Sequence, residues 1–102
     1  MNKIHKEVTS AGTFYHNELN QRHREDGPAA IYNSGTEMWY INDRLHRLNG
    51  PAVVYPNSTL ENMWWVDGFR YNTFKKFIEV VKDRISEEDY FILMLTYGQE
   101  NA

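Results

Sequence analysis

One seven-residue phrase occurs twice in this chain, and an internal repeat constrains the fold more than any single residue does. The phrase has the pattern His-Arg-x-Asp/Asn-Gly-Pro-Ala and spans His23–Ala29 and then His46–Ala52, so the two copies lie 23 residues apart. The segment Trp39–Asp43 returns 25 residues later as Trp64–Gly68, and a connecting loop at Tyr55–Glu61 would tolerate the two extra residues. The sequence therefore predicts successive copies of one structural unit.

The repeat weakens towards both ends. Gly12–Asn17 is a degenerate first copy of Gly35–Asn42. In the third copy, Tyr71 and Asn72 stand where the His-Arg pair stood. We therefore predict two good units and a fragment.

Short apolar runs follow each Gly-Pro step and predict β-strands. Ala29–Tyr32 and Ala52–Tyr55 each lead into a turn signal, and second strands are expected at Glu37–Ile41 and Asn62–Val66. Each unit is then a β-hairpin, and chained hairpins give an antiparallel meander of about five or six strands.

The Asp26-Gly27 and Asn49-Gly50 steps mark the turns between units. Asp-Gly and Asn-Gly tolerate the positive φ that tight turns demand.

Both faces of the second strands carry large apolar side chains. Met38 and Tyr40 point one way and Trp39 and Ile41 the other. The next unit repeats this alternation through Met63 and Trp65 on one face and Trp64 and Val66 on the other. We expect the C-terminal segment to cover one face and an aromatic stripe to remain on the other.

The C-terminal third predicts two helices. The first is expected to begin at an N-cap Asn72 and to run to about Arg84, with apolar residues at helical spacing on one stripe. The second is expected at Glu87–Tyr97, with Ser86 as its N-cap, an acidic first turn and Gly98 at its end. This second helix is apolar nearly all round, which is typical of a buried helix. Residues 99–102 are expected to fray.

The predicted fold class is α+β, in one domain: an N-terminal segment (1–11), a sheet of repeated hairpins (12–72) and a helical cap (73–102). The chain has 11 basic and 14 acidic residues, unlike the basic surplus of a dedicated DNA-binding domain. It has no cysteine, which excludes disulfides and thiolate metal sites. With no signal-peptide core and no apolar run of roughly 20 residues, we expect a cytoplasmic protein without a membrane span.

The pattern Trp-Tyr-x-Asn-x-x-x-His-Arg-x-Asn-Gly-Pro-Ala resembles the MORN-like repeats, in the variant form found in bacteriophage and large-virus open reading frames. The resemblance covers about residues 12–72 and rests on Trp39-Tyr40, His23-Arg24, His46-Arg47 and the two Gly-Pro-Ala triplets. It implies a twisted single-layer antiparallel sheet, and binding or scaffolding rather than catalysis. The usual second Asn-Gly is replaced by Asn42-Asp43, and the third unit lacks His-Arg. This predicts a compact two-unit piece with a helical cap rather than a long membrane-docking array.

The His-Arg pairs admit a catalytic reading, which we rank below a structural one. His23 or His46 can act as acid or base, and Arg24 or Arg47 can hold a phosphate. Residues that recur once per repeat usually serve the repeat, so we expect the histidines to stack on aromatic rings and the arginines to hold carboxylates or turn carbonyls. The sequence shows no metal-ligand spacing, phosphate loop or nucleophile elbow. We expect no enzyme activity, metal or cofactor.

The aromatic set admits three readings: core packing, a protein interface, or base stacking on single-stranded nucleic acid. Acidic residues cancel the charge of the interleaved arginines, so a protein interface ranks above nucleic acid. The predicted partner-binding residues are Trp39, Tyr40, Trp64, Trp65, Arg24 and Arg47.

The sequence thus predicts a non-enzymatic protein-binding module. Analogy with small phage-encoded proteins makes it a stoichiometric inhibitor of a host protein, for example an anti-CRISPR or anti-restriction factor in the host cytoplasm. One alternative is binding of an anionic ligand, lipid headgroup or nucleotide through His23, Arg24, His46 and Arg47. Another is a phosphodiesterase-type enzyme. A homodimer through a sheet edge or the aromatic stripe also stays open.

Overall fold

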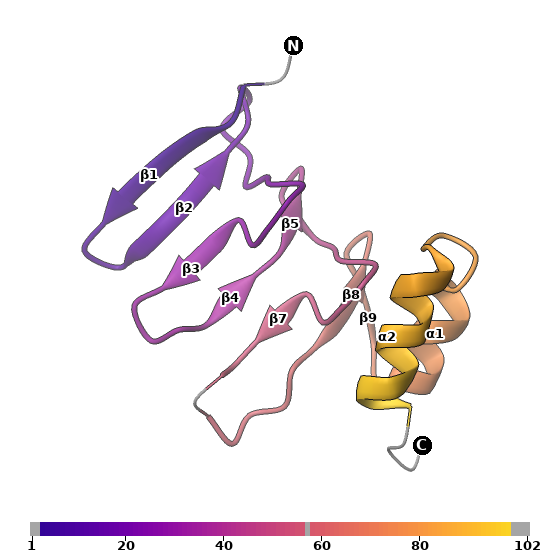
Figure 1. Cartoon of the computed structure of the whole chain (residues 1–102). Helices are drawn as coiled ribbons and strands as arrows, with labels where there is room; N and C mark the ends of the chain where they lie inside the picture. Colours follow the sequence, from indigo (N-terminus) through magenta and orange to yellow (C-terminus); the bar gives the residue numbers. More distant parts are fainter. Residues whose placement is uncertain (1–2, 57, 99–102) are drawn as a thin grey trace.

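The computed structural model describes residues 3–56 and 58–98. The expected fraying of residues 99–102 lies outside this range. The fold is α+β, as the sequence predicts: antiparallel strands come first and two helices follow. Figure 1 shows successive hairpins along the molecule, with both helices beyond the last of them.

The largest element is a five-stranded antiparallel sheet with the strand order β1-β2-β3-β4-β7. Its strands are β1 (His5–Thr9), β2 (Gly12–His16), β3 (Ala30–Tyr32), β4 (Glu37–Met38) and β7 (Val53–Val54). Each repeat unit contributes strands to this sheet, which therefore grows unit by unit along the chain.

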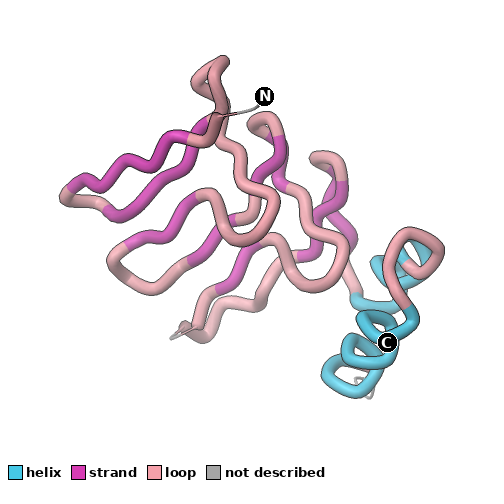
Figure 2. The backbone as a smooth tube through the Cα atoms, turned by 45° about the horizontal axis from the view of Figure 1, so that its top comes forward, coloured by secondary structure: helices cyan, strands magenta, loops and turns pink. Residues whose placement is uncertain are grey.

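Two short ribbons accompany this sheet. They pair β5 (Tyr40–Ile41) with β6 (Arg44–Leu45), and β8 (Trp64–Val66) with β9 (Phe69–Tyr71). Figure 2 shows these ribbons as strand segments separated by loops from the main sheet.

The predicted strand at 37–41 is interrupted at Trp39. The Trp39 N–H donates to the Ala52 carbonyl at 2.8 Å, and the Trp39 carbonyl accepts from the His46 N–H at 3.0 Å. The chain thus leaves the pairing of β4 with β7 and begins the pairing of β5 with β6. In the next unit, Met63 forms an isolated bridge with Val53 before β8 begins.

Positive φ is found at the ribbon tips rather than at the predicted Asp-Gly and Asn-Gly steps. The tip residues Asn42, Asp43, Asp67 and Gly68 have φ of 49°, 69°, 51° and 83°. The chain bends at the predicted steps, and neither Gly27 nor Gly50 is among the positive-φ residues, so these turns form without it.

Helix α1 spans Phe74–Val81, and its N-cap is Thr73, whose hydroxyl accepts from the Lys76 N–H at 3.1 Å. The predicted cap, Asn72, was one residue too early, and the helix ends before Arg84. Helix α2 spans Glu87–Tyr97, as predicted. The Ser86 hydroxyl accepts from the Asp89 N–H at 3.0 Å, and Gly98 is the C-cap.

The main core lies between the last ribbon and the helices. Trp64 and Val66 project from one face of β8 and pack with the buried face of α1 and with Leu93 of α2. The Trp64 ring centroid is 4.5 Å from that of Phe77 and 4.8 Å from that of Tyr97. The helices therefore cover the Trp64 face of the last ribbon. Neither described helix is long and apolar enough to cross a bilayer.

The expectation that α2 is buried all round was wrong. Leu93 is the one α2 residue in the buried core among those described. Phe91, Ile92 and Leu95 are 68%, 52% and 69% exposed. The last ribbon and α1 cover one side of α2 and leave the other side open.

Candidate functional site

The two repeated histidines each hold the tip of the following ribbon. His23 is buried, and its Nδ1 accepts from the Asn42 N–H at 3.1 Å. His46 repeats the contact: its Nδ1 accepts from the Asp67 N–H at 2.9 Å. Because Asn42 and Asp67 have positive φ, each histidine fixes a turn that an L-residue otherwise disfavours.

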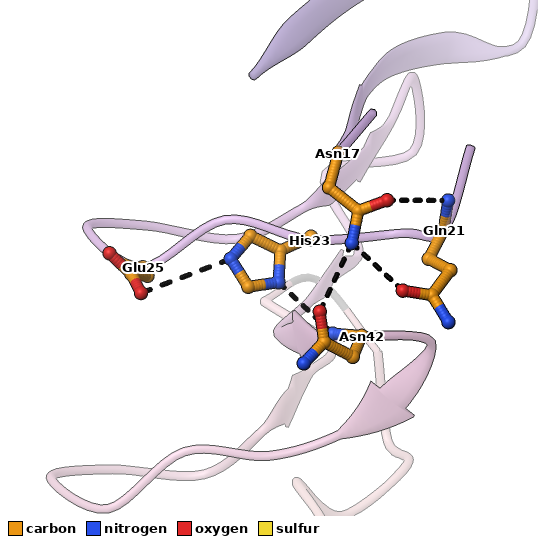
Figure 3. Close-up of polar contacts among 5 residues, drawn as sticks. All are labelled: Asn17, Gln21, His23, Glu25 and Asn42. Atoms are coloured by element: carbon orange, nitrogen blue, oxygen red, sulfur yellow. Dashed lines mark hydrogen bonds and ion pairs between the residues drawn. The ribbon is translucent and has the colours of Figure 1, made fainter. Parts of the chain in front are cut away.

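Figure 3 shows how the first histidine is linked to the preceding loop. The Asn17 amide nitrogen donates to Gln21 Oε1 at 2.9 Å and to Asn42 Oδ1 at 3.0 Å. His23 Nε2 lies 3.9 Å from a Glu25 carboxylate oxygen. The histidine is thus part of a polar network that joins neighbouring units.

The repeated arginines close their own turns. Arg24 Nε donates to Asp26 Oδ1 at 3.0 Å, and its Nη1 donates to the Pro28 carbonyl at 3.2 Å. Arg47 makes the same two contacts, to Asn49 Oδ1 at 3.3 Å and to the Pro51 carbonyl at 3.1 Å. The expectation that the arginines hold carboxylates or turn carbonyls is confirmed.

The repeated arginines stack on aromatic rings, a role that the sequence expectation had given to the histidines. The guanidinium carbon of Arg24 lies 4.1 Å from the centroid of the Tyr15 ring. That of Arg47 lies 3.8 Å from the Trp39 ring, in a cation–π contact. A Cβ at Gly50 would lie 2.6 Å from the same guanidinium carbon. Glycine at this step therefore leaves room for the stacked arginine.

Trp64 stands in the third unit where Tyr15 and Trp39 stand in the first two. At this position the two helices, rather than an arginine, cover the aromatic ring. Tyr15 and Trp39 are each covered by an arginine, whereas Trp64 is covered by Phe77 and Tyr97. The cap thus replaces the missing third His-Arg pair and ends the array.

The six predicted partner-binding residues do not form one open surface. Trp64 is 8% exposed and belongs to the core, so it is not available to a partner. Trp65 follows it on β8 and points to the opposite face. Trp39, Tyr40 and Trp65 are half-buried, and Arg24 and Arg47 are engaged within their own turns as described above.

The residues predicted to bind an anionic ligand are also engaged in contacts within the repeat. This hypothesis needs His23, Arg24, His46 and Arg47 on one exposed face. Both histidine Nδ1 atoms and both guanidinium groups instead contact the repeat itself. Among the described residues, no group of three or more His, Asp or Glu side chains is arranged to hold a metal ion.

The pKa of His46 is lowered from its ordinary value of 6.5, chiefly because the imidazole is buried. The Asp67 carboxylate, 3.1 Å from Nδ1, opposes this shift, and Arg84 adds to it. Below pH 6.5 the unfolded chain therefore binds more protons at this position than the folded chain does. The stability that neutral His46 contributes is complete above pH 6.5 and is lost as the pH falls below it.

We expect the free energy of unfolding to be lower at about pH 5.5 than at about pH 7.5. In His46→Asn this difference should shrink, because an amide oxygen can accept the Asp67 N–H without titrating. Chemical denaturation at both pH values measures the effect. An equal pH dependence in the two proteins would show that His46 does not contribute to it.

The open face of α2 is the surface feature that sequence reasoning missed. Phe91, Ile92 and Leu95 are its most exposed members, and Tyr90 and Met94 flank them at 37% and 36% exposure. The apolar composition of α2 was the available signal, but it was taken as a sign of burial within the chain.

A groove of about 740 Å³ adjoins the C-terminal end of α2. Met94, Tyr97 and Gly98 of this end line it, together with the start of α1 and the segment around 60–63. Arg70 and Lys75 also line the groove, against one carboxylate, Glu61.

The N-terminal end of α2 is acidic. Glu87, Glu88 and Asp89 form its first turn, where carboxylates complement the helix dipole. Among the described residues, none of Glu87, Glu88, Arg70 and Lys75 belongs to an ion pair.

Comparison of the chain with protein-family models, with curated proteins and with solved structures finds no match. The function is therefore argued from the surface itself.

Proposed function

We propose that this protein is a non-enzymatic protein-binding module and that its partner docks on the outward face of α2. The observation that carries the proposal is the exposure of Phe91, Ile92 and Leu95 on one side of a single helix. Contiguous exposed apolar patches mark interaction surfaces, whereas scattered exposed apolar residues need no explanation.

The spacing of these residues supports docking of an elongated apolar partner. Phe91 and Leu95 are four residues apart and Ile92 lies beside them, which is the pattern of a helix that offers one face to a groove or to another helix. Fully burying one such side chain stabilises by roughly 1.5–3 kcal/mol. A partner that covers all three therefore gains several kcal/mol before the costs of association are subtracted.

The contacts of the repeated His-Arg pairs support placing the partner on α2 rather than on the repeat. His23, Arg24, His46 and Arg47 direct their polar atoms to turns and rings of the repeat. The repeat then serves as the scaffold, and α2 presents the apolar side chains. The protein-binding role expected from the sequence is kept, and its contact surface moves from the sheet aromatics to α2.

The finer form of the proposal is a stoichiometric inhibitor of a host protein in the host cytoplasm. The resemblance of residues 12–72 to repeats in bacteriophage reading frames motivates it. Identification of the captured protein tests it.

The test is capture of a partner by tagged protein from nuclease-treated bacterial lysate, with Phe91→Glu/Leu95→Glu as the disrupting variant. Both positions are exposed, so the two glutamates are tolerated in the helix but oppose apolar docking. We expect the wild-type protein to retain a stoichiometric protein and the variant to lose it.

A matched control carries Val8→Glu/Leu19→Glu, which adds the same charge at two exposed positions away from α2. This control should retain the partner. Equal retention by all three proteins, or equal loss from both variants, would show that α2 is not the docking face. Circular dichroism checks that each variant is folded.

A further inference from the structure

We infer that the groove beside the last strand position of the main sheet binds an extended segment of a partner protein, which adds a strand to the sheet. This inference goes beyond the proposed function, because Phe91, Ile92 and Leu95 do not line the groove. Strand addition takes its affinity from main-chain hydrogen bonds and its specificity from alternate side chains.

The repeat shows that one strand position is open at this edge. In the second unit, Met38 pairs with Ala30 on one side and with Val53 on the other. Its counterpart in the third unit, Met63, pairs with Val53 on one side. Figure 1 shows this last segment of the sheet beside β7. Among the described residues, no strand pairs with its other side.

The backbone groups of Asn62 point to the open position. The Met63 N–H donates to the Val53 carbonyl at 2.9 Å, and the Val53 N–H donates to the Met63 carbonyl at 3.2 Å. Because the backbone groups of successive strand residues face opposite sides, those of Asn62 face away from β7. Within residues 3–56 and 58–98 they have no hydrogen-bond partner. The counterpart of Asn62, Glu37, pairs with Val54 on this side.

The helices replace the turn of the missing unit but not its strand. In the second unit, Arg47 stands in the turn before β7 and covers Trp39. In the third unit, Phe77 of α1 covers Trp64, so α1 takes the place of that turn. The groove of about 740 Å³ lies between the segment 60–63 and the helices, where the next strand would follow. Its volume is in the range of roughly 300–1,000 Å³ that is typical of ligand sites.

The strands that fill this position in the preceding units indicate which segment the groove accepts. β3 pairs with β2 and β7 pairs with β4 in the same register. The segments Ala29–Tyr32 and Ala52–Tyr55 share an order: a small or β-branched residue, a β-branched residue and a tyrosine follow the first alanine. β-branched and aromatic residues favour the extended backbone. We expect the partner segment to have this order.

The walls of the groove suit an extended segment better than a helix. Met63, Ile78 and Met94 offer apolar contacts from the strand and from both helices. A helix satisfies its own backbone groups internally, so it would leave the N–H and carbonyl of Asn62 unpaired. A strand pairs both groups and places alternate side chains against the apolar walls.

The experiment is a titration of the ¹⁵N-labelled full chain with the synthetic peptide acetyl-Ala-Val-Val-Tyr-Pro-amide, which has the sequence of residues 52–56. We expect saturable amide shifts centred on Asn62 and Met63. Two peptides methylated on one backbone nitrogen are the matched pair. Methylation at the second valine removes the N–H that would donate to Asn62 and should weaken binding at least about tenfold. Methylation at the first valine, whose N–H points away, should leave binding unchanged.

Two variants of the chain test the same edge from the other side. Asn62→Pro removes the backbone donor, whereas Asn62→Ala keeps it, and both lose the side-chain acceptor of the Tyr55 N–H. The alanine variant should bind the peptide, and the proline variant should bind it at least about tenfold more weakly. Circular dichroism checks folding, and the methylated peptides decide the question if the proline variant unfolds.

Three results would overturn the inference: no saturable shift, shifts that gather on β1 or on Phe91–Leu95, or equal affinities of the two methylated peptides. The variant Phe91→Glu/Leu95→Glu should bind the peptide as the wild-type protein does. This separates the groove from the proposed docking face, because failure at either surface leaves the other intact.

Discussion

Replacing Trp64 by alanine should lower the free energy of unfolding by about 3–5 kcal/mol, the cost typical of removing a large aromatic side chain from a packed core. Trp64 is 8% exposed and its ring packs against Phe74, Phe77 and Tyr97. Domains of this size are stable by roughly 5–15 kcal/mol, so the variant should be close to unfolding at moderate temperature. Urea denaturation followed by circular dichroism measures the change.

The neighbouring tryptophan is the matched control. Trp65 lies next along β8 but faces away from the helices and is half-buried. Trp65→Ala should therefore cost clearly less than Trp64→Ala. Equal costs would mean that the helices do not make Trp64 the centre of the core.

Replacing His23 by alanine should destabilise the fold by about 1–3 kcal/mol, the cost of leaving a buried polar group without its partner. The Asn42 N–H would lose its acceptor, and Asn42 has positive φ at the tip of the ribbon. His5→Ala is the control, because His5 is exposed on the edge strand β1. Thermal unfolding of the two variants gives the comparison, and equal transition temperatures would contradict the structural role of His23.

The parts of the fold that local chemistry determines were predictable from the sequence. The Gly-Pro steps and alternating strands indicated chained hairpins, and Ser86 and Gly98 marked the ends of α2 correctly. The interruption at Trp39 was not predictable, because it depends on hydrogen bonds to Ala52 and His46, which lie next to β7 and β6. Periodicity alone carries no information on such pairing.

The candidate site was harder to predict, for two physical reasons. The recurrence of the His-Arg pair pointed correctly to the arginine contacts, yet Gly50 was read as a φ signal although it makes room for Arg47. An apolar helix requires a cover, but sequence does not say whether the cover lies in the same chain. In α2 the chain covers Leu93 and leaves Phe91 and Leu95 exposed.

The most direct test of the docking face is a titration of ¹⁵N-labelled wild-type protein with the partner protein captured from lysate, followed by amide chemical shifts. The account predicts that partner-dependent shifts gather on Glu87–Tyr97. Shifts centred instead on Trp39, Tyr40 and Trp65 would contradict it and would return the interface to the aromatic residues of the repeat.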